Sequence, residues 1–397
     1  MRKFLIFLCV CVVCFFNVSP SYYIYAESLN LNKTTIEKDL LENINVKLED
    51  FDFSVLDSYL QKINNASNLI GNTSFLDVVK GVVSGEYFTS YSSLFDLIKS
   101  MLVSSFKNVI PVLFLIIGVA VLCNILNSLK PTSVGTGVSD VIHFVSFSIV
   151  VLIVVSNFNN VISLTKNVLE SMSEQMEIIF PILLTLLTSV GGVASVGIYK
   201  PVVVLLTQGV SLVFNKFLFP MFILAFVFLV LGNLSKNIKL NKFTSLLSSL
   251  FKWCLGFVFT IFATIITLQG VSAGKFDGIS VKATKFAVKS YIPLIGGYIS
   301  DGFDLIMCAS ILIKNAVGLV GVLIILFSII SPIIQILILK FGLQLVSAIL
   351  EVSGDSQICN FAAGCSKVLV YPIVLICAVA FMYVLSVGLI MMTANVF

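Results

Sequence analysis

Three ionisable residues in an otherwise apolar part of the sequence could carry chemistry. Asp301 and Asp304 are three residues apart, so a helix would place both carboxylates on one face, and Lys314 follows ten residues later on nearly the same side. Ionisable side chains at membrane depth are functional candidates, and a carboxylate pair that faces a cavity could carry protons or a cation. The alternative is that the aspartates lie at the water interface and that the Lys314 amine extends to such an interface.

Glycine and proline gather in two further apolar segments, where the helical hydrogen bonding would be interrupted. Such a pair of segments in successive halves of a membrane domain is typical of an internally repeated transporter, which binds its substrate at unwound backbone. The simpler interpretation is favoured by the small side chains nearby: glycines let membrane helices pack closely, and their neighbours tolerate the prolines. The candidate residues are Pro181, Gly191 and Gly192 in the first segment and Pro293, Gly296 and Gly297 in the second.

Several other kinds of chemistry are excluded by composition. The sequence has one His, one Trp and one Arg, which leaves no His-based metal site, no Ser-His-Asp triad and no arginine cluster for phosphate or nucleic acid. It contains no phosphate-binding P-loop and no nucleophile beside a base. Of nine Cys, three lie before residue 15, and Cys359 and Cys365 lack a second pair to complete a metal site. We therefore expect no enzymatic activity and no cofactor or metal.

The elements that position these residues belong to a membrane protein. The 397 residues are 58% hydrophobic and 11% charged, whereas a water-facing surface needs roughly 25–35% charged residues. Residues 1–26 have a basic start, a thirteen-residue apolar run from Phe4 to Phe16 and a polar end at Ala26, which predicts a secretory signal peptide. An uncleaved anchor is the alternative. In both cases the chain that follows lies outside the cytoplasm.

Residues 27–107 differ physically from the rest of the chain. They carry seven Lys against eleven acids, whereas residues 108–397 carry fifteen Lys against nine acids. Apolar residues recur at helical spacing from Ile36 to Ile63, which predicts an amphipathic, extracytoplasmic helical segment. This segment is either a small helical domain that packs on the membrane part or a docking surface for an exported partner.

Residues 108–397 are predicted to form a polytopic transmembrane domain, which makes the fold class all-α. At about twenty residues per crossing, we expect about seven transmembrane helices. Phe341–Leu350 is expected to be a short re-entrant or interfacial piece. The predicted spans are Val109–Leu126, Val141–Ser156, Ile178–Val196, Val202–Leu231, Phe251–Leu268, Leu305–Leu339 and Val368–Met392.

The orientation of the spans follows from the distribution of lysines. With residue 27 outside, the acidic loop 157–177 is predicted to be external and the lysines from Lys236 to Lys252 internal. This distribution favours two short membrane passes within the segment Val202–Leu231. One broken helix is the alternative. A second lysine cluster, from Lys275 to Lys289, would then lie outside, so one cluster breaks the rule or one segment does not cross.

Two runs of residues resemble the stage III sporulation protein AE family. The first joins Ile179–Leu187 to Gly191–Ser195, and the second runs from Lys289–Pro293 through Gly296-Gly297 and Ser300-Asp301 to Lys314–Gly321. The order of leader, exported helical segment and polytopic remainder is similar as well. A loop at Ile349–Asp355 resembles the family's acidic loop but lacks its proline, so nothing is transferred to it.

The resemblance implies a multi-pass protein of the mother-cell membrane around the engulfed forespore, needed for forespore development and late gene expression. It would belong to a secretion-like channel complex with a secretion-type ATPase, small membrane subunits and ring-forming proteins as partners, without nucleic acid. A transporter that moves a small solute, or couples proton entry to export through broken helices near Asp301 and Asp304, is the alternative hypothesis.

Overall fold

The computed structural model describes residues 136–234, 240–291, 296–352 and 356–393, together with residues 109–119 and scattered positions between 77 and 125. The described residues form helices and no strand, which confirms the all-α prediction. The predicted signal peptide and nearly all of the segment 27–107 lie outside the described residues. The main elements are α6 (Thr136–Ser189), α7 (Val193–Val213), the π-helical turn η3 (Phe214–Leu218), α8 (Phe219–Leu234), α9 (Asn241–Tyr291), α10 (Gly296–Val352), α11 (Ser356–Val368) and α12 (Val370–Met392).

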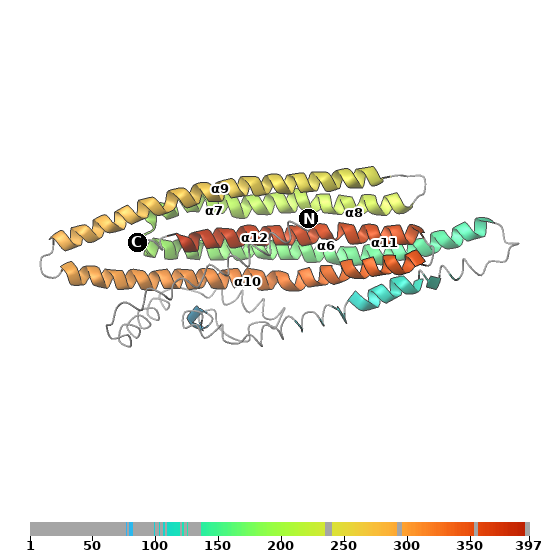
Figure 1. The fold of residues 1–397 in the computed structure, drawn as a ribbon, viewed down its shortest axis with the longest axis horizontal. Coiled ribbons are helices and arrows are strands. Elements are labelled where there is room, and N and C mark those ends of the chain that lie inside the picture. The colour runs from blue at the N-terminus through green and yellow to red at the C-terminus, as the bar shows by residue number, and fades with distance from the viewer. Residues whose placement is uncertain are drawn as a thin grey trace.

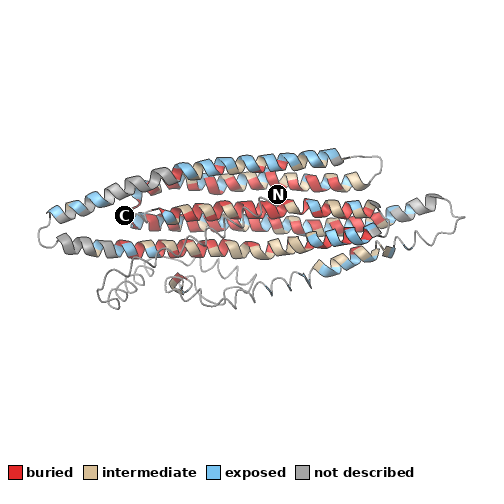
Figure 2. Ribbon diagram, in the orientation of Figure 1, coloured by how far each residue is buried: buried red, intermediate tan, exposed pale blue. Residues whose placement is uncertain are grey.

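These helices form an elongated bundle (Figure 1). α7 and α8 follow each other in one direction, as do α11 and α12, and the other consecutive helices run antiparallel. α12 carries no charged residue and is buried along most of its length, so it is the central helix of the bundle (Figure 2). α6 packs against α10, α12 and α7, while α9 packs against α7, α8 and α10. The core therefore surrounds α12, and the other long helices separate it from the outside.

Five helical stretches are long and apolar enough to cross a membrane, which makes the chain a membrane protein. The sequence predicted about seven spans, and the described residues hold five, with Val109–Val119 as a shorter apolar helix. The five stretches are Phe144–Ser189, Val193–Asn233, Lys242–Gln269, Ile306–Glu351 and Gln357–Met392.

The predicted external loop over residues 157–177 is wrong, because this segment is the middle of α6, a single helix of 54 residues. The same helix contains the predicted span Val141–Ser156 and most of the next one. Buried side chains recur through the segment at helical spacing, for example Val161 and Met172, which are three turns apart. The polar residues that suggested a loop occupy the other face of the helix.

The predicted pair of short passes over Val202–Leu231 is also wrong. α7, η3 and α8 follow one another without a turn, so this segment is one helix with a π-helical insertion, closer to the broken-helix alternative. Within the insertion, the Asn215 side-chain amide donates to Ser211 Oγ at 3.1 Å. A π-helical turn adds one residue to a turn without ending the helix, so the two polar residues here do not produce a hairpin.

The predicted separate piece Phe341–Leu350 is the continuation of α10, a helix of 57 residues that contains Pro332 in its interior. Leu339, Leu343 and Val346 continue the buried face of α10 through this region. α10 packs extensively on α11 here, so tertiary contacts stabilise the helix through the positions where hydropathy suggested a boundary.

One hairpin projects beyond the rest of the bundle. Phe259 of α9 contacts Phe381 of α12, with ring centroids 6.1 Å apart, so α9 passes the end of α12 near residue 270. Lys314 of α10 contacts Thr393, just after α12 ends. Residues 270–291 and 296–313, here called the projecting hairpin, therefore extend about 27 Å past the end of α12 at 1.5 Å per residue (Figure 1).

Candidate functional site

A buried lysine ends the core at one end of the bundle. Lys314 is 0% exposed, and its Nζ donates a hydrogen bond to the Thr393 carbonyl oxygen. The Tyr199 and Thr393 hydroxyls share a hydrogen bond of 2.8 Å, and both residues are buried. Tyr199, Lys314 and Thr393, here called the α12-end cluster, thus join α7, α10 and the end of α12.

The α12-end cluster has a clear electrostatic basis. The last carbonyl groups of a helix have no partner within the helix and carry the negative end of its dipole. Thr393 follows the last residue of α12, and its N–H still bonds back to the Leu389 and Ile390 carbonyls. A lysine amine that donates to this terminus offsets part of the cost of burying its charge. Lys314 therefore holds α10 against the end of α12.

The first predicted glycine segment lies at the same end of the bundle. Gly191 has a φ of 90° in the turn between α6 and α7, and a Cβ on Gly192 would lie 2.9 Å from the Leu187 carbonyl oxygen. These two glycines let the chain reverse within three residues. The reversal places the first turns of α7, including Tyr199, beside the end of α12. Pro181 lies on the exposed face of α6 and does not end that helix.

The second predicted segment is placed at another connection between helices. α9 ends at Tyr291 and α10 begins at Gly296, followed by Gly297, while Pro293 lies outside the described residues. Asp301 and Asp304 belong to the backbone of α10 within the projecting hairpin, and their side chains are not among those described. A rise of 1.5 Å per residue separates Asp304 from Lys314 by about 15 Å along the helix axis.

The structure thus places Lys314 at the same end of the bundle as the turn at Gly191-Gly192 and places the aspartates nearer the start of α10. Both glycine pairs lie at helix ends, in contrast to the unwound helix centres expected of a transporter. In the part of the chain that the structure describes, no three His, Cys, Asp or Glu side chains gather as metal ligands would. The functional roles of the candidate residues remain predictions.

A further feature was missed in the sequence: a continuous polar face on α6. From Ser156 to Thr188 the exposed side chains of one face are all polar except Pro181. In the preceding turns the same face exposes Val145 and Leu152. The face, here called the α6 polar stripe, consists of Ser156, Asn159, Asn160, Ser163, Lys166, Asn167, Glu170, Glu174, Glu177, Thr185 and Thr188.

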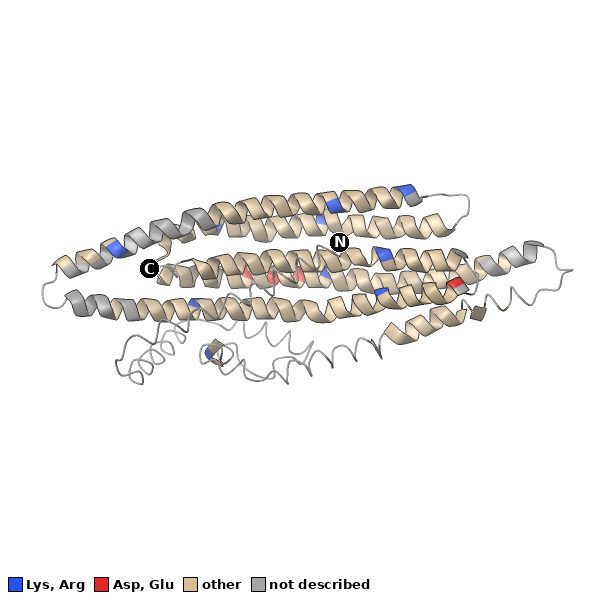
Figure 3. Cartoon of the chain, in the orientation of Figure 1, with Lys and Arg blue, Asp and Glu red and all other residues tan. Residues whose placement is uncertain are grey.

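Charged residues are sparse along the bundle, so the charges of the stripe stand out (Figure 3). Lys166 Nζ lies 3.7 Å from Glu170 Oε1, one helical turn away, which leaves Glu174 and Glu177 as excess negative charge. A helical projection of residues 156–188 would have shown this face in the sequence. The assumption of a loop prevented that step.

Comparisons with known proteins agree with the family resemblance. The model of the family described as stage III sporulation protein AE matches residues 73–394, which is more than half of the chain. The protein named stage III sporulation protein AE of Bacillus subtilis (strain 168) is 28% identical over 275 residues, which is 69% of this chain and 69% of that protein. No solved structure matches the chain.

Proposed function

The chain belongs to the stage III sporulation protein AE family, and from that premise we propose that it is a membrane subunit of a secretion-like channel complex between mother cell and forespore. Membership of this family implies a role in sporulation. The proposed place of action is the mother-cell membrane around the engulfed forespore. The proposed role there is to support forespore development and late gene expression.

The proposed partners are a secretion-type ATPase, small membrane subunits and ring-forming proteins. A protein that assembles with several others in a membrane needs a surface that lipid does not cover. The α6 polar stripe is the observation that carries the proposal. It runs over 33 residues, which corresponds to about 48 Å of helix.

The level of the stripe within the bundle shows why lipid is a poor neighbour for it. Ser173 of α6 and Phe259 of α9 lie at the level of Tyr383 and Phe381 in α12. At that level α9 exposes large apolar side chains, including Ile261, as a lipid-facing helix does. The hydrocarbon layer offers no hydrogen bonds to amides or carboxylates, so such groups need protein or water beside them. A subunit interface or a water path between subunits supplies both.

The proposal is tested by making the stripe apolar. We expect the triple variant Asn160→Leu, Asn167→Leu, Glu174→Leu to reach the membrane at the wild-type level, because all three side chains are exposed and leave the core intact. Co-purification of the other complex proteins should fall by at least about tenfold, since several interface contacts of about 1 kcal/mol each are lost. Sporulation should fall with it.

The control is Gln208→Leu, which replaces an exposed polar side chain of α7 outside the stripe. It should change neither co-purification nor sporulation. Normal co-purification by the triple variant would contradict the proposal. An equal loss of membrane level and co-purification would show that the stripe is covered within the chain itself, which would contradict it as well.

The alternative transporter function needs Asp301 and Asp304 inside the bundle. The backbone of α10 places both in the projecting hairpin, about 15 Å or more beyond Lys314 and the end of α12. This position agrees better with carboxylates at a water interface, so the channel-complex subunit is the function that the geometry supports best.

A further inference from the structure

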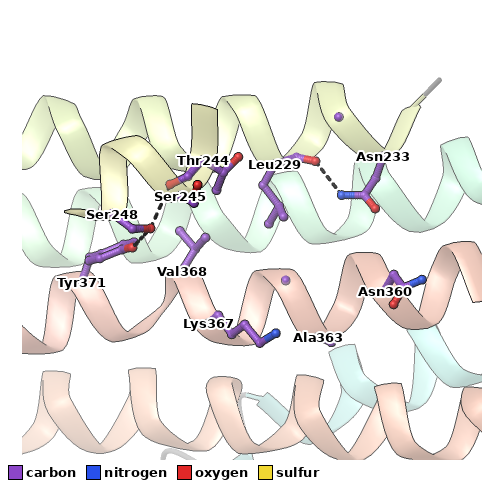
Figure 4. A pocket seen from close by; sticks show the side chains of 12 residues that line it. Leu229, Asn233, Thr244, Ser245, Ser248, Asn360, Ala363, Lys367, Val368 and Tyr371 are labelled. Carbon is purple, nitrogen blue, oxygen red and sulfur yellow. Dashed lines mark hydrogen bonds between the residues drawn. The ribbon is translucent and has the colours of Figure 1, made fainter. Parts of the chain in front are cut away.

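A polar pocket opens at the end of the bundle opposite the α12-end cluster. It lies between the end of α8, the start of α9 and the junction of α11 with α12, and its volume is about 560 Å³ (Figure 4). Binding sites for small molecules commonly have volumes of about 300–1,000 Å³. The polar side chains that line the pocket are Asn233, Thr244, Ser245, Ser248, Asn360, Lys367 and Tyr371.

The walls of the pocket are held by hydrogen bonds. The Tyr371 hydroxyl donates to Ser248 Oγ, and Ser248 in turn donates to the Thr244 carbonyl oxygen at 2.9 Å. On the α8 side, the Asn233 side-chain amide donates to the Leu229 carbonyl at 2.8 Å. The main-chain carbonyl of Asn233 accepts a hydrogen bond from the Gln357 side-chain amide at 2.8 Å. These bonds join α8, α9, α11 and α12 around the pocket, so its shape is set without a ligand.

The available donors lie on one face of α11. Asn360 and Lys367 are seven residues apart, two turns along the helix, with Ala363 and Gly364 between them. Gly364 allows Leu229 of α8 to approach closely, and the short side chain of Ala363 leaves space in front of the two polar groups. Within the described part of the chain, neither the Asn360 amide nor the Lys367 amine has a hydrogen-bond or ion-pair partner.

The charge of the lining indicates an anion. The pocket is lined by one lysine and by no Asp or Glu, so a bound anion meets attraction and no opposing carboxylate. A lysine amine supported by amide and hydroxyl groups is a common arrangement for binding phosphate.

The position of the pocket indicates which molecule carries that anion. The apolar stretch of α8 ends at Asn233 and that of α9 starts at Lys242, so the pocket lies at the boundary of the apolar layer. Trp253 is 69% exposed on α9, and tryptophan is enriched at the membrane–water interface. At the level of the pocket, the outer face of α9 exposes Leu246 and Leu250, as a helix that borders lipid does.

We propose that this pocket binds the phosphate headgroup of an anionic membrane lipid, with Lys367 and Asn360 as the principal phosphate ligands. The hydroxyl groups of Thr244 and Ser245 complete the polar wall. A lipid held here would also stabilise the packing of α8 on α11.

The test is a binding titration on the full-length protein in neutral detergent, read by native mass spectrometry. Dioleoylphosphatidylglycerol is compared with dioleoylglycerol, which has the same acyl chains and no phosphate, and with inorganic phosphate alone. We expect the phospholipid to bind and Lys367→Gln to weaken its binding by about tenfold or more, the effect of losing one charge-assisted hydrogen bond. Ala363→Leu should weaken binding as well, because it fills the pocket and keeps the charge.

The matched control is Lys252→Gln, which removes an exposed lysine of α9 outside the pocket lining and should leave the affinity unchanged. Equal binding of the phospholipid and dioleoylglycerol would overturn the proposal. So would an equal loss of affinity in the Lys252 and Lys367 variants, which would indicate general surface attraction. Binding of inorganic phosphate as tight as that of the lipid would assign the site to a soluble phosphate and overturn the lipid assignment.

Discussion

At the scale of single residues, two groups decide how the end of the bundle is built. Gly191 has a φ of 90°, a conformation that residues with a Cβ rarely adopt. Lys314 uses its charge to complete the terminus of α12, although a lysine is among the residues least often fully buried. Neither residue needs a transported ligand to explain its position, so we interpret both as structural residues.

Gly191→Ala should lower the free energy of unfolding by about 1–3 kcal/mol, because alanine is strained at this φ. Thermal unfolding of the protein purified in detergent would measure the change. Gly197→Ala is the matched control, since a Cβ at Gly197 meets no atom within 4 Å and alanine favours helix. A Gly191→Ala variant as stable as the control variant would contradict the conformation of the turn.

At the scale of helices, glycines on α10 set how closely it approaches its neighbours. A Cβ at Gly318 would lie 2.5 Å from the Met391 side chain of α12, and one at Gly321 would lie 3.2 Å from Ile179 of α6. In a membrane protein, such close packing replaces much of the hydrophobic driving force between helices. The small residues of α10 therefore allow α12 and α6 to pack closely against it in the core.

Gly318→Leu should destabilise the protein by about 1–3 kcal/mol through overpacking against Met391. The double variant Gly318→Leu, Met391→Ala should recover part of this lost stability, because the smaller alanine at position 391 makes room for the leucine at position 318. Gly256→Leu on the exposed face of α9 serves as control, with no atom within 4 Å of the added Cβ. Absence of any recovery in the double variant, measured by thermal unfolding, would mean that Gly318 and Met391 do not share this contact.

At the scale of the whole molecule, the long helices exceed the thickness of a membrane. α6, with 54 residues, is about 80 Å long, whereas the hydrocarbon layer is about 30 Å thick. α9 carries Lys242 and Lys252 of the first lysine cluster near its start and the second cluster, from Lys275 to Lys289, near its end in the projecting hairpin. The conflict therefore follows from the fold, since a helix that crosses the membrane must place one cluster on each side.

This arrangement predicts that the two ends of α9 are accessible from opposite sides. In a background without native cysteines, Lys242→Cys and Lys282→Cys should react with a membrane-impermeant maleimide only from different sides of the membrane. Both lysines are exposed at the surface, so accessibility within the protein is equal. Labelling of both positions from the same side would show that α9 does not cross.

Much of the candidate site could not be predicted from the sequence alone. Spacing identified Gly191, Gly192 and Lys314 as unusual residues, and the structure places them at the same end of the bundle. The sequence could not show that Lys314 binds the carbonyl of Thr393, because 79 residues separate them and only helix packing brings them together. The α6 polar stripe was hidden for a different reason: polar residues on one face of a buried helix lower the average hydropathy as a loop does.

The sequence by itself determined the fold class, the membrane environment and the family, because composition and apolar run length report directly on burial in lipid, and the motifs are local. Only the tertiary structure decided where helices continue, which faces they bury and which distant residues meet. α6 passes through residues 157–177 because α10, α12 and α7 cover its apolar face. Two of these helices, α10 and α12, are more than a hundred residues away in the sequence, and a window along the chain cannot record contacts with them.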